Sequence, residues 1–449
     1  MIKVAHWVVS FTIALALVGP VWADQPGSAP VATGDGLKPG DVLNRTNWQK
    51  AQGLLPPEIL KHYEKGEYAN PIVEFPPTYN WPENFLEGSR ANEGRYAIGE
   101  RGEVVEKATG KQPLYIFGYP FPTIDPADPQ AAVKILWNYN YFYWYWGSMH
   151  VQAQVNWVAP RGLERRTDQD VNFFFYDGGP EKDRSPNPHN FLMQQLLVVV
   201  RPADLNGTAA LTWRYRDPAK RDSAWAFVPA LRRVRAVSPA NRSDGFLGSD
   251  MSQDDGNFFE GKTEDFTWTL KGEVDYFRLV DPLNLAGKSN SVWLPTGGWR
   301  TYWPDMPYLG YHDPNWQGVG WAPIGMALAK RRFYLVEGVP KDKYYLYGHL
   351  ELYVDKETFQ GAWNRKFSWS GELLNTFQVA AFTPHRYVRP DGRVDYLQGS
   401  NMNFQCAENI KAFQATVAGQ KWDPNAAMDL RVPFDAAFFE TNSLARFGK

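Results

Sequence analysis

Residues 223–262 read SAWAFVPALRRVRAVSPANRSDGFLGSDMSQDDGNFFEGK, and this stretch organises the interpretation of the whole chain. Trp225 and Phe227, separated by one alanine, predict a short buried strand that Pro229 interrupts. Residues 232–237 then resume an extended pattern, so we expect a hairpin-like bend. The bend carries three arginines, which are Arg232, Arg233 and Arg235.

A loop rich in glycine, serine and aspartate follows at residues 245–255. This composition favours tight turns, because glycine adopts positive φ and aspartate bonds neighbouring backbone amides. The loop carries three carboxylates, which are Asp250, Asp254 and Asp255. We expect them to form charge-assisted hydrogen bonds with the three arginines. Catalysis, or contact with a head group or a partner, is the alternative, although adjacent aspartates on a strand would face opposite ways.

The order of Trp225, VPALRRVR and LGSDMSQDD resembles a signature of bacterial periplasmic proteins related to the outer-membrane lipoprotein-sorting (LolA-like) carriers. The resemblance covers residues 225–255 specifically and the chain from about residue 94 more loosely. The relatives it most resembles form a family of unknown function. The resemblance therefore implies a fold and a transport context: an α+β, mainly β protein with a curved antiparallel half-barrel, helices packed on its concave face and an apolar cavity between them.

The first 23 residues have the pattern of a secretory signal peptide, with a short basic region, an apolar run over residues 7–18 and small residues before Asp24. No later stretch reaches about 18 uninterrupted apolar residues. Because the residue directly after the signal is Asp24 and not a cysteine, we expect an exported periplasmic protein that is not lipidated and is at most peripheral to the outer membrane.

Composition narrows the class of function. The net charge of −2 argues against nucleic acid as a partner. Cys406 stands alone, so no internal disulfide is expected. Aromatic residues make up 15% of the chain, enough to line a large core or a cavity.

We expect an extended N-terminal segment at residues 24–93, with a short helix at 57–65 ended by Gly66, and a single domain at 94–449. Aromatic residues at helical spacing predict an amphipathic helix at about 129–146. Alternating patterns then predict antiparallel strands at 149–157, 171–176, 191–200 and 209–215. Residues 284–325 form a long loop insertion, interpreted as a cavity cover, and helices are expected at 408–417 and 435–446.

Eight aromatic residues are the candidates for the wall of an apolar cavity. They are Trp137, Tyr139, Tyr143, Trp146, Trp213, Trp225, Phe227 and Trp268. Packing of the same residues into an ordinary core is the simpler interpretation of their spacing.

The sequence contains no close pair of histidines at metal-ligand spacing, no nucleophile elbow and no phosphate-cradling or dinucleotide loop. We therefore expect no metal, no cofactor and no enzymatic activity. The leading hypothesis is a carrier or adaptor for a lipid or other hydrophobic molecule. The resemblance implies an inner-membrane efflux-type transporter and an outer-membrane protein as partners.

Two other hypotheses remain open. A glycan-binding or glycoside-processing protein would use the aromatic residues as stacking platforms and carboxylates as acid and base. A non-catalytic outer-membrane assembly factor would use the sheet as a partner surface.

Overall fold

A computed structural model provides the structure of most of the chain. It describes residues 36–76, 81–180, 184–288, 290–294, 298–302, 308–380, 383, 385–388, 392, 394–397, 404–420 and 427–447. The predicted signal peptide lies outside the described residues.

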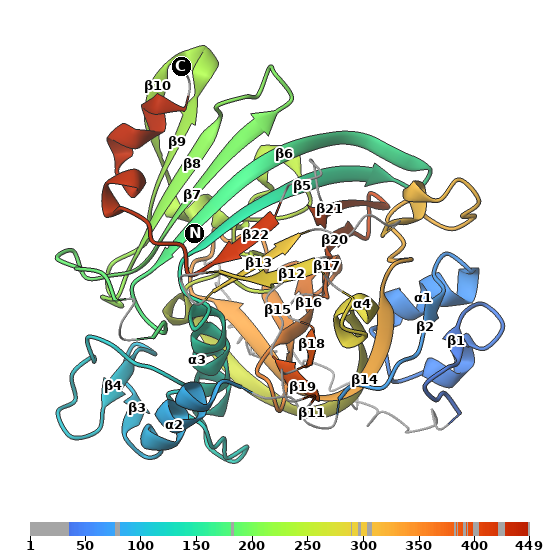
Figure 1. The fold of residues 1–449 in the computed structure, drawn as a ribbon, viewed down its shortest axis with the longest axis horizontal. Helices are drawn as coiled ribbons and strands as arrows, with labels where there is room; N and C mark the ends of the chain where they lie inside the picture. The colour runs from blue at the N-terminus through green and yellow to red at the C-terminus, as the bar shows by residue number, and fades with distance from the viewer. Residues whose placement is uncertain are drawn as a thin grey trace, which may run out of the picture.

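One curved antiparallel sheet forms the body of the protein (Figure 1). Its main path runs β10-β9-β8-β7-β6-β5-β21-β20-β17-β16-β15-β14-β11, and β12, β13 and β22 attach beside β5. β10 and β11 form its two ends and pair with only one strand each, so the described sheet curves without closing. The predicted antiparallel, mainly β half-barrel is confirmed.

The strand bounds of this sheet are β5 Met149–Ala159, β6 Gly162–Phe175, β7 Phe191–Arg201, β8 Ala209–Tyr215, β9 Ser223–Val228, β10 Arg233–Val237, β11 Phe266–Val280, β12 Asn290–Trp293, β13 Trp299–Tyr302, β14 Ala327–Pro340, β15 His349–Asp355, β16 Gly361–Phe367, β17 Leu373–Val379, β20 Gln405–Asn409, β21 Gln414–Gln420 and β22 Ala427–Leu430. Three two-stranded ribbons accompany it: β1 Val42–Leu43 with β2 Asn70–Pro71, β3 Tyr96–Ile98 with β4 Val104–Glu106, and β18 His385–Val388 with β19 Val394–Leu397.

The described α-helices are α1 Pro57–Lys65, α2 Glu83–Ala91, α3 Ala131–Trp144 and α4 Pro282–Leu285. Short 3₁₀ helices lie at Trp48–Ala51, Pro229–Leu231, Pro239–Ser243, Phe246–Gly248, Thr263–Asp265, Gly310–His312, Ala436–Phe439 and Thr441–Arg446. None of the described helices is long and apolar enough to cross a membrane.

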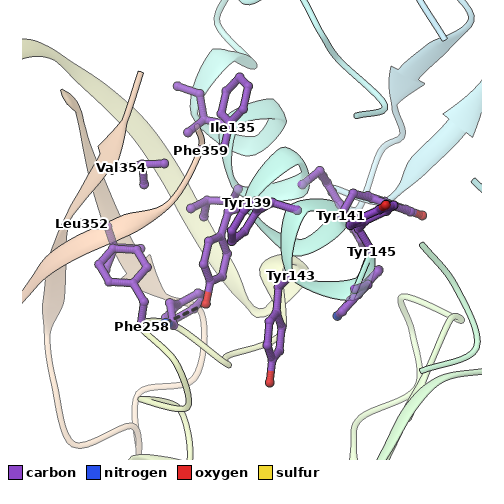
Figure 2. Packing of buried hydrophobic residues seen from close by; sticks show 14 of the residues in the cluster. Ile135, Tyr139, Tyr141, Tyr143, Tyr145, Phe258, Leu352, Val354 and Phe359 are labelled. Carbon is purple, nitrogen blue, oxygen red and sulfur yellow. Dashed lines mark hydrogen bonds between the residues drawn. The ribbon is translucent and has the colours of Figure 1, made fainter. Parts of the chain in front are cut away.

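Helix α3 packs on the concave face of the sheet, as predicted (Figure 1). Nearly all of its side chains are buried, including Ile135 and Phe142. A helix that is apolar on all sides is stable only where protein surrounds it. Figure 2 shows Tyr139 of α3 beside Phe258 and facing Leu352 of β15, so the helix joins the sheet and the segment before β11 into one core.

Helix α1 has the predicted bounds but packs on the opposite face of the sheet. Pro57 stands at its first position, and Gly66 ends it with a φ of 79° that favours glycine. Its buried residues join a second cluster with Phe277 of β11 and Trp363 of β16. Because strand side chains alternate between faces, this cluster lies on the convex side, away from α3.

His62 of α1 lies in a buried ion cluster on this convex side. Its Nδ1 is 2.7 Å from Glu67 Oε2 and its Nε2 is 2.8 Å from Glu408 Oε1. Burial lowers the pKa of His62. The hydrogen bonds and charges of Glu408 and Glu67 raise it by more, so the pKa is about 9. The charged imidazolium is therefore the form that stabilises the fold near neutral pH.

Raising the pH is expected to weaken the fold through His62. A folded-state pKa above the unfolded value contributes stability that is complete below about pH 6.5 and lost as the pH rises through about 9. The free energy of unfolding should fall by up to about 3 kcal/mol over that window. Urea unfolding at about pH 6.5 and about pH 9 measures this fall in the free energy of unfolding. The fall should be smaller in His62→Gln than in the wild type. An equal fall in wild type and variant would contradict the assignment.

Three expectations about secondary structure need correction. Residues 408–417, predicted as a helix, belong to the hairpin of β20 and β21. β20 pairs with β17 and β21 pairs with β5, so both strands lie inside the sheet. The described part of 284–325 contains β12 and β13, and its residues Tyr308, Leu309 and Trp321 pack in the convex-side cluster, not over a cavity. Helix α2 was not predicted.

Candidate functional site

The stretch between β10 and β11, residues 238–265, is here called the crossing segment. β10 and β11 are the two ends of the sheet's path, so the chain between them connects opposite edges of the sheet. It crosses on the concave face, because its partner Asn364 stands opposite Leu352, which packs in the cluster of α3. Its backbone is tied to the floor of the sheet: Asn364 Nδ2 of β16 donates to Phe258 O at 3.0 Å, and Asn375 Nδ2 of β17 donates to Asp250 O at 3.2 Å. The crossing segment therefore fills the half-barrel from one edge to the other.

Arg242 forms the main polar anchor of the crossing segment. Its guanidinium contacts Asp254 Oδ1 at 2.6 Å and Asp222 Oδ2 at 3.2 Å, and donates to Glu260 O at 2.9 Å. Arg214 of β8 contacts the same Asp222 at 2.8 Å. Burial raises the pKa of Asp222, but Arg214 and Arg242 outweigh it and hold that pKa below its usual value. All of these side chains are buried, so charge pairing is what makes their burial tolerable.

Asp250 and Asp255 anchor the middle of the crossing segment to the sheet. Asp250 accepts hydrogen bonds from Asn409 Nδ2 at 3.0 Å and Gln414 Nε2 at 3.2 Å. Asp255 forms a buried ion pair with Lys366 of β16. Burial raises the pKa of Asp255, and the charge of Lys366 opposes part of that rise.

The predicted pairing of three arginines with three aspartates is wrong. The side chains of Arg232, Arg233 and Arg235 are exposed on the hairpin at the sheet edge. The physical reason is the path of the chain, which places the aspartates within the half-barrel: Asp254 pairs with Arg242, Asp255 pairs with Lys366, and Asp250 accepts from neutral amides. Arg232 instead supplies the left-handed residue of the turn, with a φ of 48°.

Two further carboxyl groups of the crossing segment are buried and have pKa values close to 7. Burial raises the pKa of Glu260 to about 7, opposed by Arg214 and Arg242. Burial likewise raises the pKa of Glu264 to about 7, opposed mainly by Lys262. Each of these carboxyls therefore exists as a mixture of the neutral and charged forms near pH 7.

A cavity of about 160 Å³ lies between the crossing segment and one wing of the concave face. Strands β5 to β8, β20 and β21 form its floor. Its wall consists of Val151, Ala153, Val155, Gln169, Val171, Phe173, Gln195, Leu197, Ala210, Thr212, Phe246, Ser249, Met251, Ser252, Gln253, Gly256, Asn257, Gln405, Ala418 and Gly419.

The alternation of strand side chains explains why this wall is apolar. Val151, Ala153 and Val155 of β5 face the cavity, and the intervening polar residues face the other side. On that other side His150 Nε2 lies 2.8 Å from Asp170 Oδ1. The period-two pattern of β5 was visible in the sequence, and it is the signal that could have identified these cavity residues.

The eight aromatic candidates do not form this wall. Five of them belong to the core around α3 on the concave face; they are Trp137, Tyr139, Tyr143, Trp146 and Trp268. Figure 2 shows Tyr139 and Tyr143 among their neighbours in that core. Trp137 also borders a much smaller hollow of about 10 Å³.

The other three candidates lie on the convex face, under the C-terminal 3₁₀ helices; they are Trp213, Trp225 and Phe227. Trp213 Nε1 donates to Phe439 O at 2.8 Å. The candidate wall was therefore wrong for this cavity. Large aromatic rings fill space in tightly packed cores, whereas the hollow lies where small residues such as Ala153 and Ala210 leave room.

Within the part of the chain that the structure describes, no three His, Cys, Asp or Glu side chains are grouped to hold a metal ion. The site is described by its shape and by its neutral polar groups, and the ion pairs of Arg242 and Lys366 hold the crossing segment in place beside it.

Comparison with solved structures finds distant similarities. A domain described as an outer membrane lipoprotein-sorting protein from Vibrio parahaemolyticus is 14% identical, with a TM-score of 0.45, over 71% of this chain and 100% of that chain. A DUF1329 family protein from Desulfovibrio piger is 16% identical, with a TM-score of 0.42, over 71% and 100%. A LolA superfamily protein from Nitrosomonas europaea is 14% identical, with a TM-score of 0.40, over 70% and 98%.

No curated protein matches the sequence. A family model, described as "Protein of unknown function (DUF1329)", matches residues 42–445. This match covers nearly the whole chain, and it confirms the resemblance to a family of unknown function that residues 225–255 carry. The chain therefore belongs to the DUF1329 family.

Proposed function

We propose that the protein is a non-enzymatic carrier or adaptor that binds part of a hydrophobic molecule in the cavity beneath the crossing segment. The observation that supports this function is a hollow of about 160 Å³ whose wall is mainly apolar, with amide and hydroxyl groups among its valine, alanine and leucine side chains. A concave, mainly apolar hollow with a few polar groups is the usual form of a site for a small hydrophobic molecule.

The size of the cavity limits what it holds. Its volume of about 160 Å³ is similar to that of an apolar cavity of about 150 Å³ that accepts a molecule the size of benzene. Burial of about six methylene groups contributes about 5 kcal/mol, which corresponds to a dissociation constant below 1 mM. The cavity therefore fits one aromatic ring or a short segment of an acyl chain.

The cellular setting of the proposal comes from the sequence. The signal-peptide pattern of residues 1–23 supports export to the periplasm. An inner-membrane transporter and an outer-membrane protein as partners rest on the sequence resemblance. The eight aromatic candidates give glycan stacking no support, because they are packed into clusters and do not form an exposed platform.

Filling the cavity tests the proposal. Ala153 lies in the middle of the wall, between Val151 and Val155 and opposite Gln169 in the β5–β6 register. Ala153→Phe should weaken the binding of toluene at least about tenfold, because the new ring occupies the ligand's place. Its free energy of unfolding should fall by less than about 1 kcal/mol, because the ring enters an existing hollow. Calorimetric titration and urea unfolding measure the two quantities.

The matched control is Ala236→Phe on the exposed edge strand β10, which should bind toluene like the wild type. Toluene binding that is absent in the wild type, or unchanged in Ala153→Phe, would refute a ligand site in this cavity. Copurification of an apolar molecule from periplasm, detected by native mass spectrometry, would identify the natural cargo.

A further inference from the structure

We infer that the cavity selects an uncharged ligand, such as an ester, amide or alcohol of an apolar chain, and rejects the corresponding carboxylate or phosphate. This inference rests on the proposed function and specifies its ligand class. Its basis is that the described wall contains amide and hydroxyl side chains among apolar ones and no ionisable side chain.

The polar groups of the wall form a neutral strip. Gln195 of β7 and Thr212 of β8 stand directly opposite each other in the strand register, and both border the cavity. Gln169 of the neighbouring β6 also borders it, and Gln405 of β20 borders it from beyond β5 and β21. Amides and hydroxyls both donate and accept hydrogen bonds, so this strip can pair with a carbonyl or hydroxyl group of a ligand without a counter-charge.

The charges nearest to the wall already have partners. Arg214 follows Thr212 on the same face of β8, but its guanidinium contacts Asp222 and Glu260 O. Asp250 accepts hydrogen bonds from Asn409 and Gln414. Arg242 pairs with Asp254 and Lys366 with Asp255, whereas Glu260 and Glu264 are buried and have pKa values of about 7. Lys262 donates to Asp217 O and Lys220 O, and Arg165 of β6 donates to Leu247 O and lies over the Trp157 ring.

An anionic ligand would therefore meet a wall that offers no cation of its own. Burying an unpaired carboxylate is so costly that the group takes up a proton instead. Only the neutral acid would bind, and its concentration falls tenfold with each pH unit above its pKa, which lies near that of a glutamic acid side chain at about 4.3. The apparent affinity for a carboxylic acid should therefore depend steeply on pH, whereas that for its ester should not.

The experiment titrates the full protein with methyl hexanoate and with hexanoate at pH 6 and pH 8, using toluene as the reference ligand. We expect the affinity for hexanoate to fall about 100-fold between the two pH values, because its neutral fraction falls by that factor. The affinity for methyl hexanoate and toluene should change less than about threefold. Glu260 and Glu264 titrate between the two pH values, and the ester measures any effect of their titration on binding.

Adjacent glutamines of β7 provide the matched variants. Gln195→Leu should weaken methyl hexanoate about three- to tenfold through the loss of a hydrogen bond, and leave toluene unchanged. Gln194 faces the other side, where it accepts a hydrogen bond from Tyr176 Oη at 2.6 Å, so Gln194→Leu should leave both ligands unchanged.

The outcomes separate the two claims. If toluene binds, and the ester and the carboxylate bind with equal affinity at pH 8, the neutral-ligand inference is overturned. The proposed function is then left intact. Failure of every ligand, toluene included, would reject the proposed function itself. Tighter binding of hexanoate than of the ester would show that a cation of the crossing segment becomes available to the ligand, and would also overturn the inference.

Discussion

Replacing Arg242 by alanine is expected to lower the free energy of unfolding by about 3–5 kcal/mol, because it removes one partner from a buried charge cluster. Arg242 contacts Asp254 at 2.6 Å and Asp222 at 3.2 Å, and it donates to Glu260 O. Its loss leaves Asp254 without a cation, although Tyr345 Oη still donates to that carboxylate at 2.9 Å. Arg214 remains beside Asp222, so the unpaired charge falls mainly on Asp254.

Urea unfolding of Arg242→Ala and of Arg235→Ala measures this effect within one stretch of sequence. Arg235 is exposed on β10, so its removal should change the free energy of unfolding by less than about 0.5 kcal/mol. Similar values for the two variants would show that the buried contacts of Arg242 do not hold the crossing segment. A double variant, Arg242→Ala with Asp254→Ala, should recover part of the loss because no unpaired carboxylate remains.

Replacing Phe258 by alanine is expected to cost about 3–5 kcal/mol of unfolding free energy. The Phe258 side chain is 1% exposed and meets the Tyr139 ring at a centroid distance of 5.5 Å (Figure 2). Gly361 of β16 lies directly below it, since a Cβ atom there would come within 1.9 Å of the Phe258 ring. The ring therefore connects the crossing segment, α3 and the floor of the sheet, and its removal opens a cavity among all three.

The control for this prediction is Leu231→Ala, because Leu231 is 49% exposed on the β9–β10 turn and should change stability by less than about 0.5 kcal/mol. Chemical unfolding followed by tryptophan fluorescence measures both variants. A loss below about 1 kcal/mol for Phe258→Ala would mean that the core closes around the deletion and that the crossing segment is held by its ion pairs alone.

Local sequence chemistry was sufficient where an element depends on its own residues. Pro57 and Gly66 set the two ends of α1 because proline suits the first helical position and glycine adopts positive φ. Alternation located β8 at Ala209–Tyr215, and β5 from Met149 onward. The same local argument failed at residues 408–417, where Ile410, Phe413 and Val417 are spaced as on a helix. Pairing with β17 and β5 overrides that spacing and makes a hairpin.

The candidate site was only partly predictable. The sequence marked residues 223–262 as its organising stretch and β5 as a strand with one apolar face, and both contribute to the site. It did not indicate that 238–265 crosses the half-barrel, because that follows from β10 and β11 being opposite ends of the sheet. It also placed the cavity among the large aromatics, whereas the hollow lies among alanines and valines.

The sequence by itself determined the antiparallel, mainly β character of the protein, because period-two alternation and turn residues act over a few neighbouring positions. Tertiary structure alone decided the charge partners: Asp255 pairs with Lys366 of β16 rather than with Arg232, Arg233 or Arg235. A buried charge is stabilised by whatever opposite charge the fold brings within a few ångströms, so the partner is set by the path of the chain across the sheet and not by nearness in sequence.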